Sequence, residues 1–488
     1  MALQFLLAPV VLRYAGKEAL GAYSFLIQMI AWGALTDLGF GVATGRRLAQ
    51  AHGFPARINF REVFETGRTF LIVSNLFFAG FILIVSWKLS VFIQLTPTIE
   101  RQAKLSLNIF ACWVACRGII SLYGDALIAT QHMADVNLIQ SAYGALRLLL
   151  SLCFVKIGWG LVGLIGANII AEAATFVTQR IRYRKLFPSD IFRWGLKNKR
   201  LFSEMFKFGL TYMVMIIAGK MYSSTDGIVV GNLLGAGAVA IVYVTQMPGT
   251  IFYQLLWRIS DNSSPAINEI YAQKNKVYLA ESYLKLCRVS MMLAICLAIG
   301  LLFMNRQAIS IWVGYDQYAG SIFTIALAGI SITQVMIHVA CVFLVAVGDI
   351  KLIVVWGVIS GVLKVALSIL LVKAIGIPGC VIGTLVLDVP SLFIYISKAN
   401  RALSIPYKTI FRLVVAPALK ANIFSCITIL LLIIIFPLPS WRTLLIRGAL
   451  YLLAFSVGAW LKGFTSDDRY RIVQLARRIK SGASRNLP

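Results

Sequence analysis

The chain has 488 residues, of which 59% are hydrophobic and 13% charged, and its formal net charge is +27. Soluble domains have about 45–50% apolar residues, so this composition excludes a soluble protein and predicts a polytopic membrane protein. The basic residues lie between hydrophobic runs rather than on one soluble domain, which excludes a nucleic-acid-binding protein.

The hydrophobic runs predict an all-α protein with about fourteen transmembrane helices, because most runs approach the roughly 20 residues that cross a bilayer. The predicted segments are 1–12, 20–44, 69–87, 105–130, 137–155, 161–180, 205–230, 237–259, 287–304, 320–346, 352–372, 379–397, 420–437 and 443–461. The first run covers only roughly 18 Å of helix, so we expect either a start upstream of Met1 or a partial span. No signal peptide pattern opens the chain.

The first two segments form a predicted hairpin. Gly16 and Gly21 permit a tight reversal and a close approach of the two helices. Asp37 is a carboxylate inside an apolar run, which is costly unless it faces protein or water. Arg46 and Arg47 follow, and they can hold the cytoplasmic end at the headgroup level.

This hairpin resembles that of the polysaccharide transporter family, the Wzx-like flippases of the multidrug/oligosaccharidyl-lipid/polysaccharide superfamily. The resemblance rests on Gly16-x4-Gly21-x-Tyr23, on Asp37-Leu38-Gly39 and on the small and basic residues at the helix exit. It implies a flippase of lipid-linked oligosaccharides that works by alternating access. It also implies contacts with membrane lipids and with the polysaccharide polymerase and chain-length machinery.

The distribution of Lys and Arg predicts the orientation in the membrane. If the loop after the second segment is cytoplasmic, the loops on that side, the tail and the segment ends next to them hold about 32 of these residues, whereas the opposite loops hold about 9. Both termini are therefore expected in the cytoplasm. Trp87, Trp159, Trp312 and Trp441 fall at the opposite turns, where interfacial tryptophan is common.

An internal repeat predicts two lobes in the same orientation. A shift of about 219 residues brings segments three to six close to segments nine to twelve, which indicates halves related by an axis along the membrane normal. The predicted parts are an N-terminal lobe at 1–180, a basic linker at 181–204, a C-terminal lobe at 205–397, two further helices at 398–461 and a basic tail at 462–488.

Charged residues inside the segments carry the functional signal, because each costs about 2.5–3.5 kcal/mol near the bilayer centre if it faces lipid. Most must therefore face the interior of the bundle or water. These residues are Asp37, Arg117, Asp125, Arg147, Glu172, Lys220, Asp226, Lys364, Asp388 and Arg447.

Two interpretations of the buried bases compete. In the first, the pairs Arg147–Glu172 and Lys364–Asp388 are structural ion pairs, one in each lobe. In the second, Arg117, Arg147 and Lys364 line a cavity and bind a diphosphate, for which the planar fork of arginine is well suited. The two are compatible, because a substrate could displace a carboxylate partner.

The resemblance adds candidate roles near the seventh segment, since the first and seventh helices of the superfamily line the central cavity. It makes Lys220 a candidate headgroup contact and Asp226 a coupling or gating carboxylate, although both could simply be hydrated near the outer mouth. Asp37, Glu172 and Asp388 are further candidates for coupling or gating, and Asp37 is also explained as a structural residue of the hairpin.

The function that this resemblance implies is translocation of polyprenyl-diphosphate-linked oligosaccharides across the bacterial plasma membrane, for O-antigen, capsule or exopolysaccharide. Alternatives are a lipid II flippase and an ion-coupled exporter of organic cations. A polymerase or ligase would need large outer loops, which the chain lacks. No hydrolase, transferase, nucleotide or metal motif is present, so we expect no enzyme, cofactor or metal, and Cys112 and Cys116 are expected to be packing residues.

Overall fold

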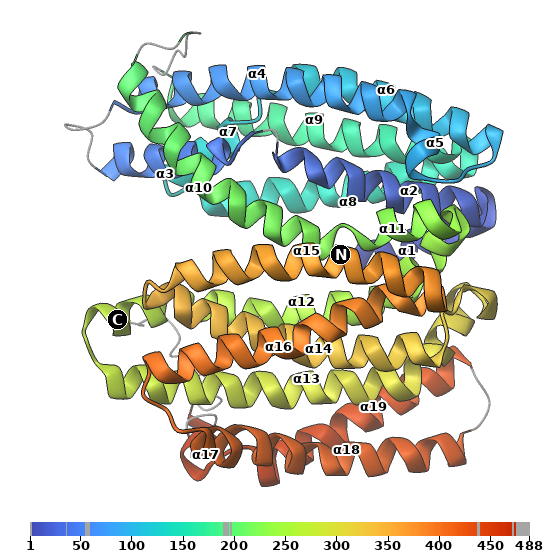
Figure 1. Ribbon diagram of the computed structural model, residues 1–488, viewed down its shortest axis with the longest axis vertical. Helices are drawn as coiled ribbons and strands as arrows, with labels where there is room; N and C mark the ends of the chain where they lie inside the picture. Colours follow the sequence, from blue (N-terminus) through green and yellow to red (C-terminus); the bar gives the residue numbers. More distant parts are fainter. Residues whose placement is uncertain are drawn as a thin grey trace. The chain divides into compact units, whose positions relative to one another are not determined.

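The computed structural model describes residues 2–35, 37–53, 59–188, 195, 198–436, 440–470 and 473–474. Helices make up nearly all of this part of the chain, and it contains no strand (Figure 1). Eleven of the described helices are long and apolar enough to cross a membrane. This confirms the predicted all-α polytopic membrane fold.

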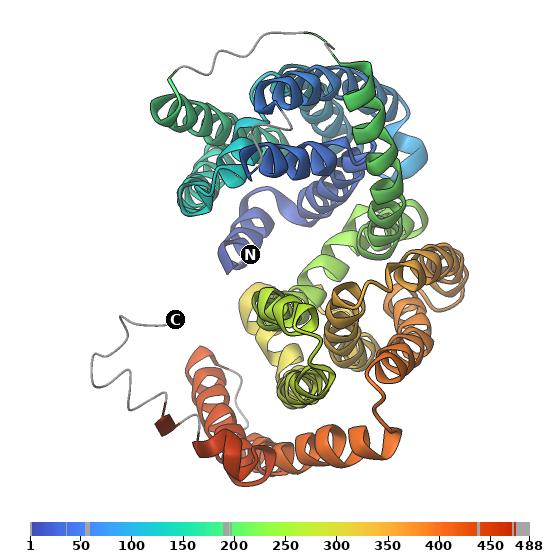
Figure 2. The same ribbon diagram turned by 90° about the vertical axis from the view of Figure 1, so that its left-hand side faces the viewer.

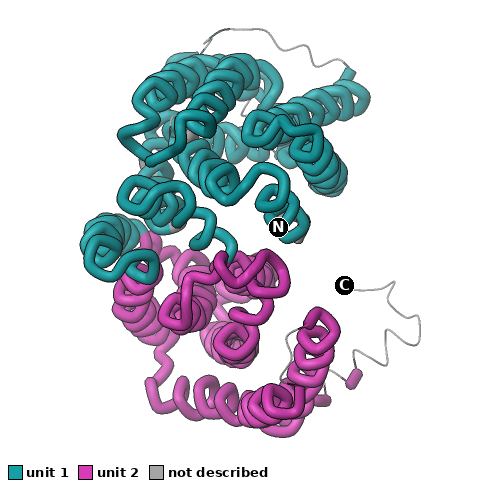
Figure 3. Tube along the Cα trace, turned by 90° about the vertical axis from the view of Figure 1, so that its right-hand side faces the viewer, with its two compact units in different colours: residues 1–244, 354–380 teal, residues 245–353, 381–488 magenta. Residues whose placement is uncertain are grey.

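The helices form two compact units, coloured separately in Figure 3. The first unit comprises residues 1–244 and 354–380, and the second comprises residues 245–353 and 381–488. The predicted lobe boundaries at 181–204 and 397 remain a prediction. The described residues of the predicted linker are 181–188, 195 and 198–204, and those of the predicted tail are 462–470 and 473–474.

The first unit contains most of the N-terminal helices. They are α1 (Ala2–Tyr14), α2 (Gly16–Ala31), α3 (Phe40–Gly53), α4 (Phe60–Trp87), α5 (Leu89–Phe92), α6 (Pro97–Arg117), α7 (Tyr123–Ala129), α8 (Met133–Ile157), α9 (Gly160–Leu186), α10 (Lys199–Ser223) and α11 (Asp226–Leu234). It also holds the start of α12 (Ala236–Ala272) and most of α15 (Ile350–Ile375). In this unit, α4 packs along α6, and α8 packs along α9 (Figure 1).

The second unit contains the rest of α12 and the C-terminal helices. They are α13 (Lys276–Val313), α14 (Ser321–Ala346), most of α16 (Pro378–Ala402), α17 (Tyr407–Ile410), α18 (Ala416–Ile435) and α19 (Trp441–Gly458). The long helix α13 packs against α14, α18 and α19, and several of these helices are seen nearly end-on in Figure 2. One strongly apolar helix therefore forms the centre of this unit.

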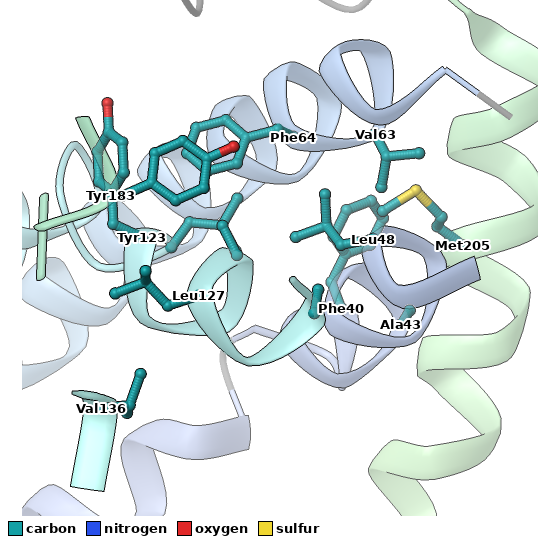
Figure 4. Packing of buried hydrophobic residues seen from close by; sticks show 13 residues of the cluster. Phe40, Ala43, Leu48, Val63, Phe64, Tyr123, Leu127, Val136, Tyr183 and Met205 are labelled. Atoms are coloured by element: carbon teal, nitrogen blue, oxygen red, sulfur yellow. The ribbon is translucent and has the colours of Figure 1, made fainter. Parts of the chain in front are cut away.

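A hydrophobic core in the first unit joins the ends of α3, α4, α7, α9 and α10. Phe40, Leu48 and Phe64 are fully buried there, and the rings of Tyr123 and Tyr183 pack beside them in tilted contacts (Figure 4). At about 1.5–3 kcal/mol for each buried large apolar side chain, this cluster contributes strongly to the stability of the unit. Through Tyr183 it also anchors α9, which lines the cavity described below.

In the described residues, all fourteen predicted segments fall on helices, but three of them are broken where a continuous span was expected. Segment 20–44 ends as α2 at Ala31 and resumes as α3 at Phe40. Leu38 and Gly39 lie between them with φ of 51° and 70°, a left-handed backbone that cannot continue an α-helix. Segment 105–130 is interrupted between α6 and α7, and segment 205–230 is interrupted between α10 and α11 at Ser224 and Thr225. Apolar periodicity alone does not report such breaks.

Candidate functional site: a cationic cavity in the first unit

A cavity of about 340 Å³ lies between α2, α6, α8 and α9, all within the first unit. We call it the cationic cavity, because Arg117 and Arg147 both line it. Its full lining consists of Ile27, Ile30, Phe110, Arg117, Gln140, Tyr143, Gly144, Arg147, Ile165, Asn168, Ala171, Glu172 and Thr175. The structure thus brings together three of the predicted site residues, Arg117, Arg147 and Glu172.

Arg117 is held in place by two polar side chains on neighbouring helices. Its Nη1 donates to Oε1 of Glu172 at 3.2 Å, and its Nε donates to Oδ1 of Asn75 at 3.1 Å. The other carboxylate oxygen of Glu172 accepts a hydrogen bond from Nε1 of Trp113 at 2.8 Å. Both carboxylate oxygens of Glu172 are therefore occupied, and Arg117 is fixed at the cavity wall.

Arg147 differs from Arg117 because it has no such fixed partner. It lies on α8 and lines the same cavity, and no hydrogen bond or ion pair to it occurs among the described residues. The predicted ion pair Arg147–Glu172 is therefore wrong, since Glu172 pairs with Arg117 instead. A guanidinium without a carboxylate leaves its donors available to an anion.

Neutral polar side chains surround the two arginines. Asn168 donates to the hydroxyl of Tyr23 at 3.3 Å and to the backbone carbonyl of Leu164 at 2.8 Å. Tyr143 exchanges a hydrogen bond of 2.7 Å with Thr178. Gln140 also lines the wall. Amides and hydroxyls of this kind can hydrogen-bond the hydroxyl groups of a polar ligand.

Lys364 and Asp226 form an ion pair at the break between α10 and α11. Lys364 is 1% exposed, and its Nζ lies 3.2 Å from Oδ1 of Asp226. The ammonium also donates to the backbone carbonyl of Tyr222 and lies over the ring of that residue. The predicted pairing of Lys364 with Asp388 is therefore wrong. Instead, the ammonium of Lys364 donates to the backbone carbonyl of Tyr222, which the helix break leaves without a helical partner.

Asp388 is fully buried in the second unit, and neutral donors surround its carboxyl group. Thr333 donates to Oδ2 at 3.0 Å, and Nε2 of Gln334 lies 3.0 and 3.1 Å from the two oxygens. Among the described residues, no cation pairs with it. One turn along α14, His338 contacts Asp261 at 2.8 Å and stacks on Trp257.

The last two predicted residues lie at helix breaks. Asp37 occupies the turn before α3, where its Oδ1 accepts the backbone N–H of Gly39 at 2.8 Å. This contact is typical of a turn carboxylate and supports the structural interpretation. Lys220 lies in the last turn of α10 and is half-buried, and its backbone carbonyl accepts from Ser224.

Sequence reasoning missed several partners of these charges. Trp113 precedes Arg117 by four residues, so the two share one helix face, and this spacing could have indicated their common contact with Glu172. Asn75 is an amide within an apolar run, a further signal for a buried polar contact. No comparable signal in the sequence indicated that Thr333 and Gln334 would face Asp388.

A family model described as "Polysaccharide biosynthesis protein" matches residues 1–271, which is more than half of the chain. The chain belongs to this family. The match includes every helix that lines the cationic cavity. No curated protein matches the chain.

Solved structures similar to this family member are transporters of the multidrug/oligosaccharidyl-lipid/polysaccharide (MOP) superfamily. The lipid II flippase MurJ in an inward closed conformation has a TM-score of 0.69 and 14% identity, over 94% of this chain and 95% of that chain. An inward-facing multidrug resistance MATE family transporter has a TM-score of 0.64 and 15% identity, over 82% and 94%. A transporter from Pyrococcus furiosus, whose binding pocket is described as having reverse polarity, has a TM-score of 0.57 and 13% identity, over 83% and 93%.

These likenesses show the MOP transporter fold. The resemblance expected from the hairpin at Gly16 and Asp37 is thereby confirmed at the level of family and fold. This member of the polysaccharide biosynthesis family is a multi-pass membrane protein.

Proposed function

We propose that the protein moves polyprenyl-diphosphate-linked oligosaccharides from the cytoplasmic to the outer leaflet of the bacterial plasma membrane, by alternating access, for surface polysaccharide synthesis. The observation that carries this proposal is that Arg147, which has no partner among the described residues, lines the same cavity as the fixed Arg117. A diphosphate offers several anionic oxygens, and an arginine fork can bind two of them at once.

In this proposal, the two arginines have different roles. Arg147 meets the diphosphate first, because no carboxylate has to leave it. Arg117 can turn one donor towards the phosphate while Trp113 and Asn75 continue to hold Glu172 and the guanidinium. We propose that Gln140, Tyr143 and Asn168, which line the same cavity, contact the first sugar, while the prenyl tail remains in the bilayer.

The test is transport of a polyprenyl-diphosphate-linked oligosaccharide by the purified protein in vesicles, with Arg147→Gln as the critical variant. Loss of one charge-assisted contact should weaken the apparent affinity about 10- to 150-fold. Abundance and melting temperature should stay near those of the unmodified protein, since no carboxylate loses its partner. Lys156→Gln is the matched control, because Lys156 is an exposed cation at the end of the same helix.

Unchanged transport by Arg147→Gln would remove this residue from the substrate site. Lys220 would then be the next candidate headgroup contact. Lipid II and an organic cation are the two alternative substrates. Adding each as a competitor for oligosaccharide transport in the same vesicles tests whether the protein prefers either one to the proposed substrate. Transport of an organic cation without any lipid-linked oligosaccharide would contradict the proposed function.

We also propose that Asp388 is the coupling carboxylate and binds a proton. The hydroxyl of Thr333 has one proton but lies within hydrogen-bond distance of Asp388 and of the backbone carbonyls of Gly329 and Ile330. It can therefore donate to the ionised carboxylate, or donate to a carbonyl and accept from the protonated acid. Glu172 and Asp226 each face a cation instead, so they are the weaker candidates for proton binding and suit a gating role.

Asp388→Asn should mimic the protonated form. In vesicles with an imposed pH gradient, the unmodified protein should transport faster than without a gradient, and the variant should lose this acceleration. Asp37→Asn is the matched control, because Asp37 contacts the backbone of its own turn. If the pH gradient accelerates transport by the Asp388→Asn variant as much as transport by the unmodified protein, Asp388 is not the coupling carboxylate.

A further inference from the structure

Gly144 lies in the middle of α8, at a place where helix packing does not account for a glycine. Glycine inside a helix is less favourable than alanine, because it loses more conformational freedom on folding. In membrane helices it usually permits the close approach of a neighbouring helix. A Cβ on Gly144, however, would meet no atom of the described residues within 4 Å, apart from its own stretch of helix. The space beside Gly144 is therefore not filled by another helix.

The close contact between α8 and α9 depends on a different glycine. A Cβ on Gly163 in α9 would lie 2.7 Å from the Cβ of Phe154 in α8, so a side chain there would push the two helices apart. Gly144 has no such neighbour among the described residues, and it lines the cationic cavity. The missing side chain of Gly144 thus leaves room in the cavity and not between helices.

Gly144 lies on the same face of α8 as two polar residues of the cavity. Gln140 precedes it by four residues and Arg147 follows it by three, so the three residues form a row along the helix. All three line the cavity, and Gln140 and Arg147 are exposed while Gly144 is half-buried. A ligand held by Arg147 can therefore lie directly against the backbone of α8 at Gly144 and reach Gln140.

We propose that Gly144 determines which sugar the cavity accepts, because it leaves space for a pyranose ring between the diphosphate at Arg147 and the amide of Gln140. This inference rests on the proposed function, in which Arg147 holds the diphosphate. On α9, Ile165 adds apolar surface to the cavity and Asn168 adds an amide. A pyranose ring has apolar C–H faces and polar hydroxyl groups around its rim, so both kinds of wall residue can contact it. A larger side chain in place of Gly144 would occupy the space of the ring.

The experiment measures the affinity of the purified full chain for two probes, undecaprenyl diphosphate and undecaprenyl diphosphate that carries one glucose. Gly144→Ala should weaken binding of the glucose-bearing probe about 10-fold, which is the effect of one added methylene group in a binding pocket. Gly144→Leu should weaken it further. Gly144→Ala should bind the sugar-free probe as tightly as the unmodified protein does, because a methyl group is too short to cover the guanidinium of Arg147. Its melting temperature should be equal or higher, since alanine favours a helix.

Gly80→Ala is the matched control, and its affinity for both probes should remain unchanged. Gly80 is a half-buried glycine inside α4, its Cβ would meet no atom within 4 Å, and it does not line the cationic cavity. If both Gly144 variants bind the glucose-bearing probe normally while Arg147→Gln binds it weakly, this inference alone is wrong. Equal weakening of both probes by Gly144→Ala would overturn it too, since the residue would then act on the diphosphate or on the fold. If the unmodified protein binds neither probe, or Arg147→Gln binds both with full affinity, the proposed function fails as well.

Discussion

At the scale of single residues, the charges inside the helices differ in whether a partner lies within reach. Lys364 and Arg117 each have a carboxylate on another helix, whereas Arg147 and Asp388 have no partner of opposite charge among the described residues. A paired charge mainly holds helices together, because removing one partner leaves the other uncompensated. An unpaired charge is available to a ligand or a proton, and this difference guides the proposals for Arg147 and Asp388.

The buried pair at the α10–α11 break should behave as a structural element. Lys364→Met should destabilise the protein by about 3–5 kcal/mol, because Asp226 then loses its counter-charge. The double variant Lys364→Met with Asp226→Asn should recover a large part of this loss. Melting temperature in detergent and abundance in the membrane measure both effects. A single variant as stable as the unmodified protein would show that the ion pair carries little stability.

At the scale of elements, close backbone contacts fix the positions of the helices that flank the breaks. Gly209 on α10 approaches the turn before α3, since a Cβ on Gly39 would lie 2.3 Å from the carbonyl oxygen of Gly209. A Cβ on Gly21 in α2 would lie 1.8 Å from the carbonyl oxygen of Ala236 at the start of α12. Glycine permits these approaches because it has no side chain.

Gly21→Ala should therefore force α2 away from the start of α12. Overpacking of this kind costs about 1–3 kcal/mol, and an overlap with backbone is harder to relieve than one with a side chain. Gly45→Ala in α3 is the control, because its Cβ would meet no atom within 4 Å and alanine favours a helix by up to about 1 kcal/mol. Thermal unfolding of the two variants in the same detergent compares them. Equal melting temperatures would contradict the close contact.

The segment after α19 is fastened to α13 by a cluster of charges. Arg288 forms an ion pair with Asp468, and Lys285 lies 3.6 Å from Asp467. Although partial burial alone raises the pKa of Asp468, hydrogen bonds from Thr465 and the charge of Arg288 hold it below its usual value. The carboxylate therefore stabilises the folded state in its ionised form.

Because the pKa of Asp468 is lowered by folding, its contribution is complete above the ordinary carboxyl pKa of about 3.9 and is lost as the pH falls below that value. Asp468→Asn should cost about 1.5–3 kcal/mol at neutral pH, since it removes hydrogen bonds to a charged group. Melting curves between neutral pH and pH 3 should fall less steeply for this variant than for the unmodified protein. If the stability of both proteins falls equally steeply with decreasing pH, the charge cluster is not an acid-sensitive contact.

At the scale of the whole molecule, the topology in the membrane rests on the distribution of basic residues. Reporter fusions after Arg57, Arg193, Lys276 and Arg478 should report the cytoplasm, because basic loops stay inside. Arg57, Arg193 and Arg478 lie outside the residues that the structure describes. Fusions after Thr98 and Asp316 should report the outside. One basic site found outside would overturn the predicted count of helices.

The sequence by itself determined the fold class, the approximate helix positions and the family. In a bilayer, the backbone polar groups of a long apolar run can be satisfied only within a helix. The number and spacing of the helices can therefore be predicted from the sequence. The hairpin at Gly16 and Asp37 could also be predicted from the sequence, because the residues that form a turn are close together in the chain. The sequence also identified which charges had to face protein or water, since lipid exposure of Arg117 or Asp388 is too costly.

Only the tertiary structure decided how those charges are partnered. A carboxylate such as Glu172 can reach bases on several neighbouring helices, and the choice of Arg117 over Arg147 depends on helix rotation and on Trp113 and Asn75. The breaks at Leu38 and at Ser224 also had to be seen, because hydrophobic periodicity continues across them. Partner choice depends on distances between helices far apart in the chain, and no local pattern encodes those distances.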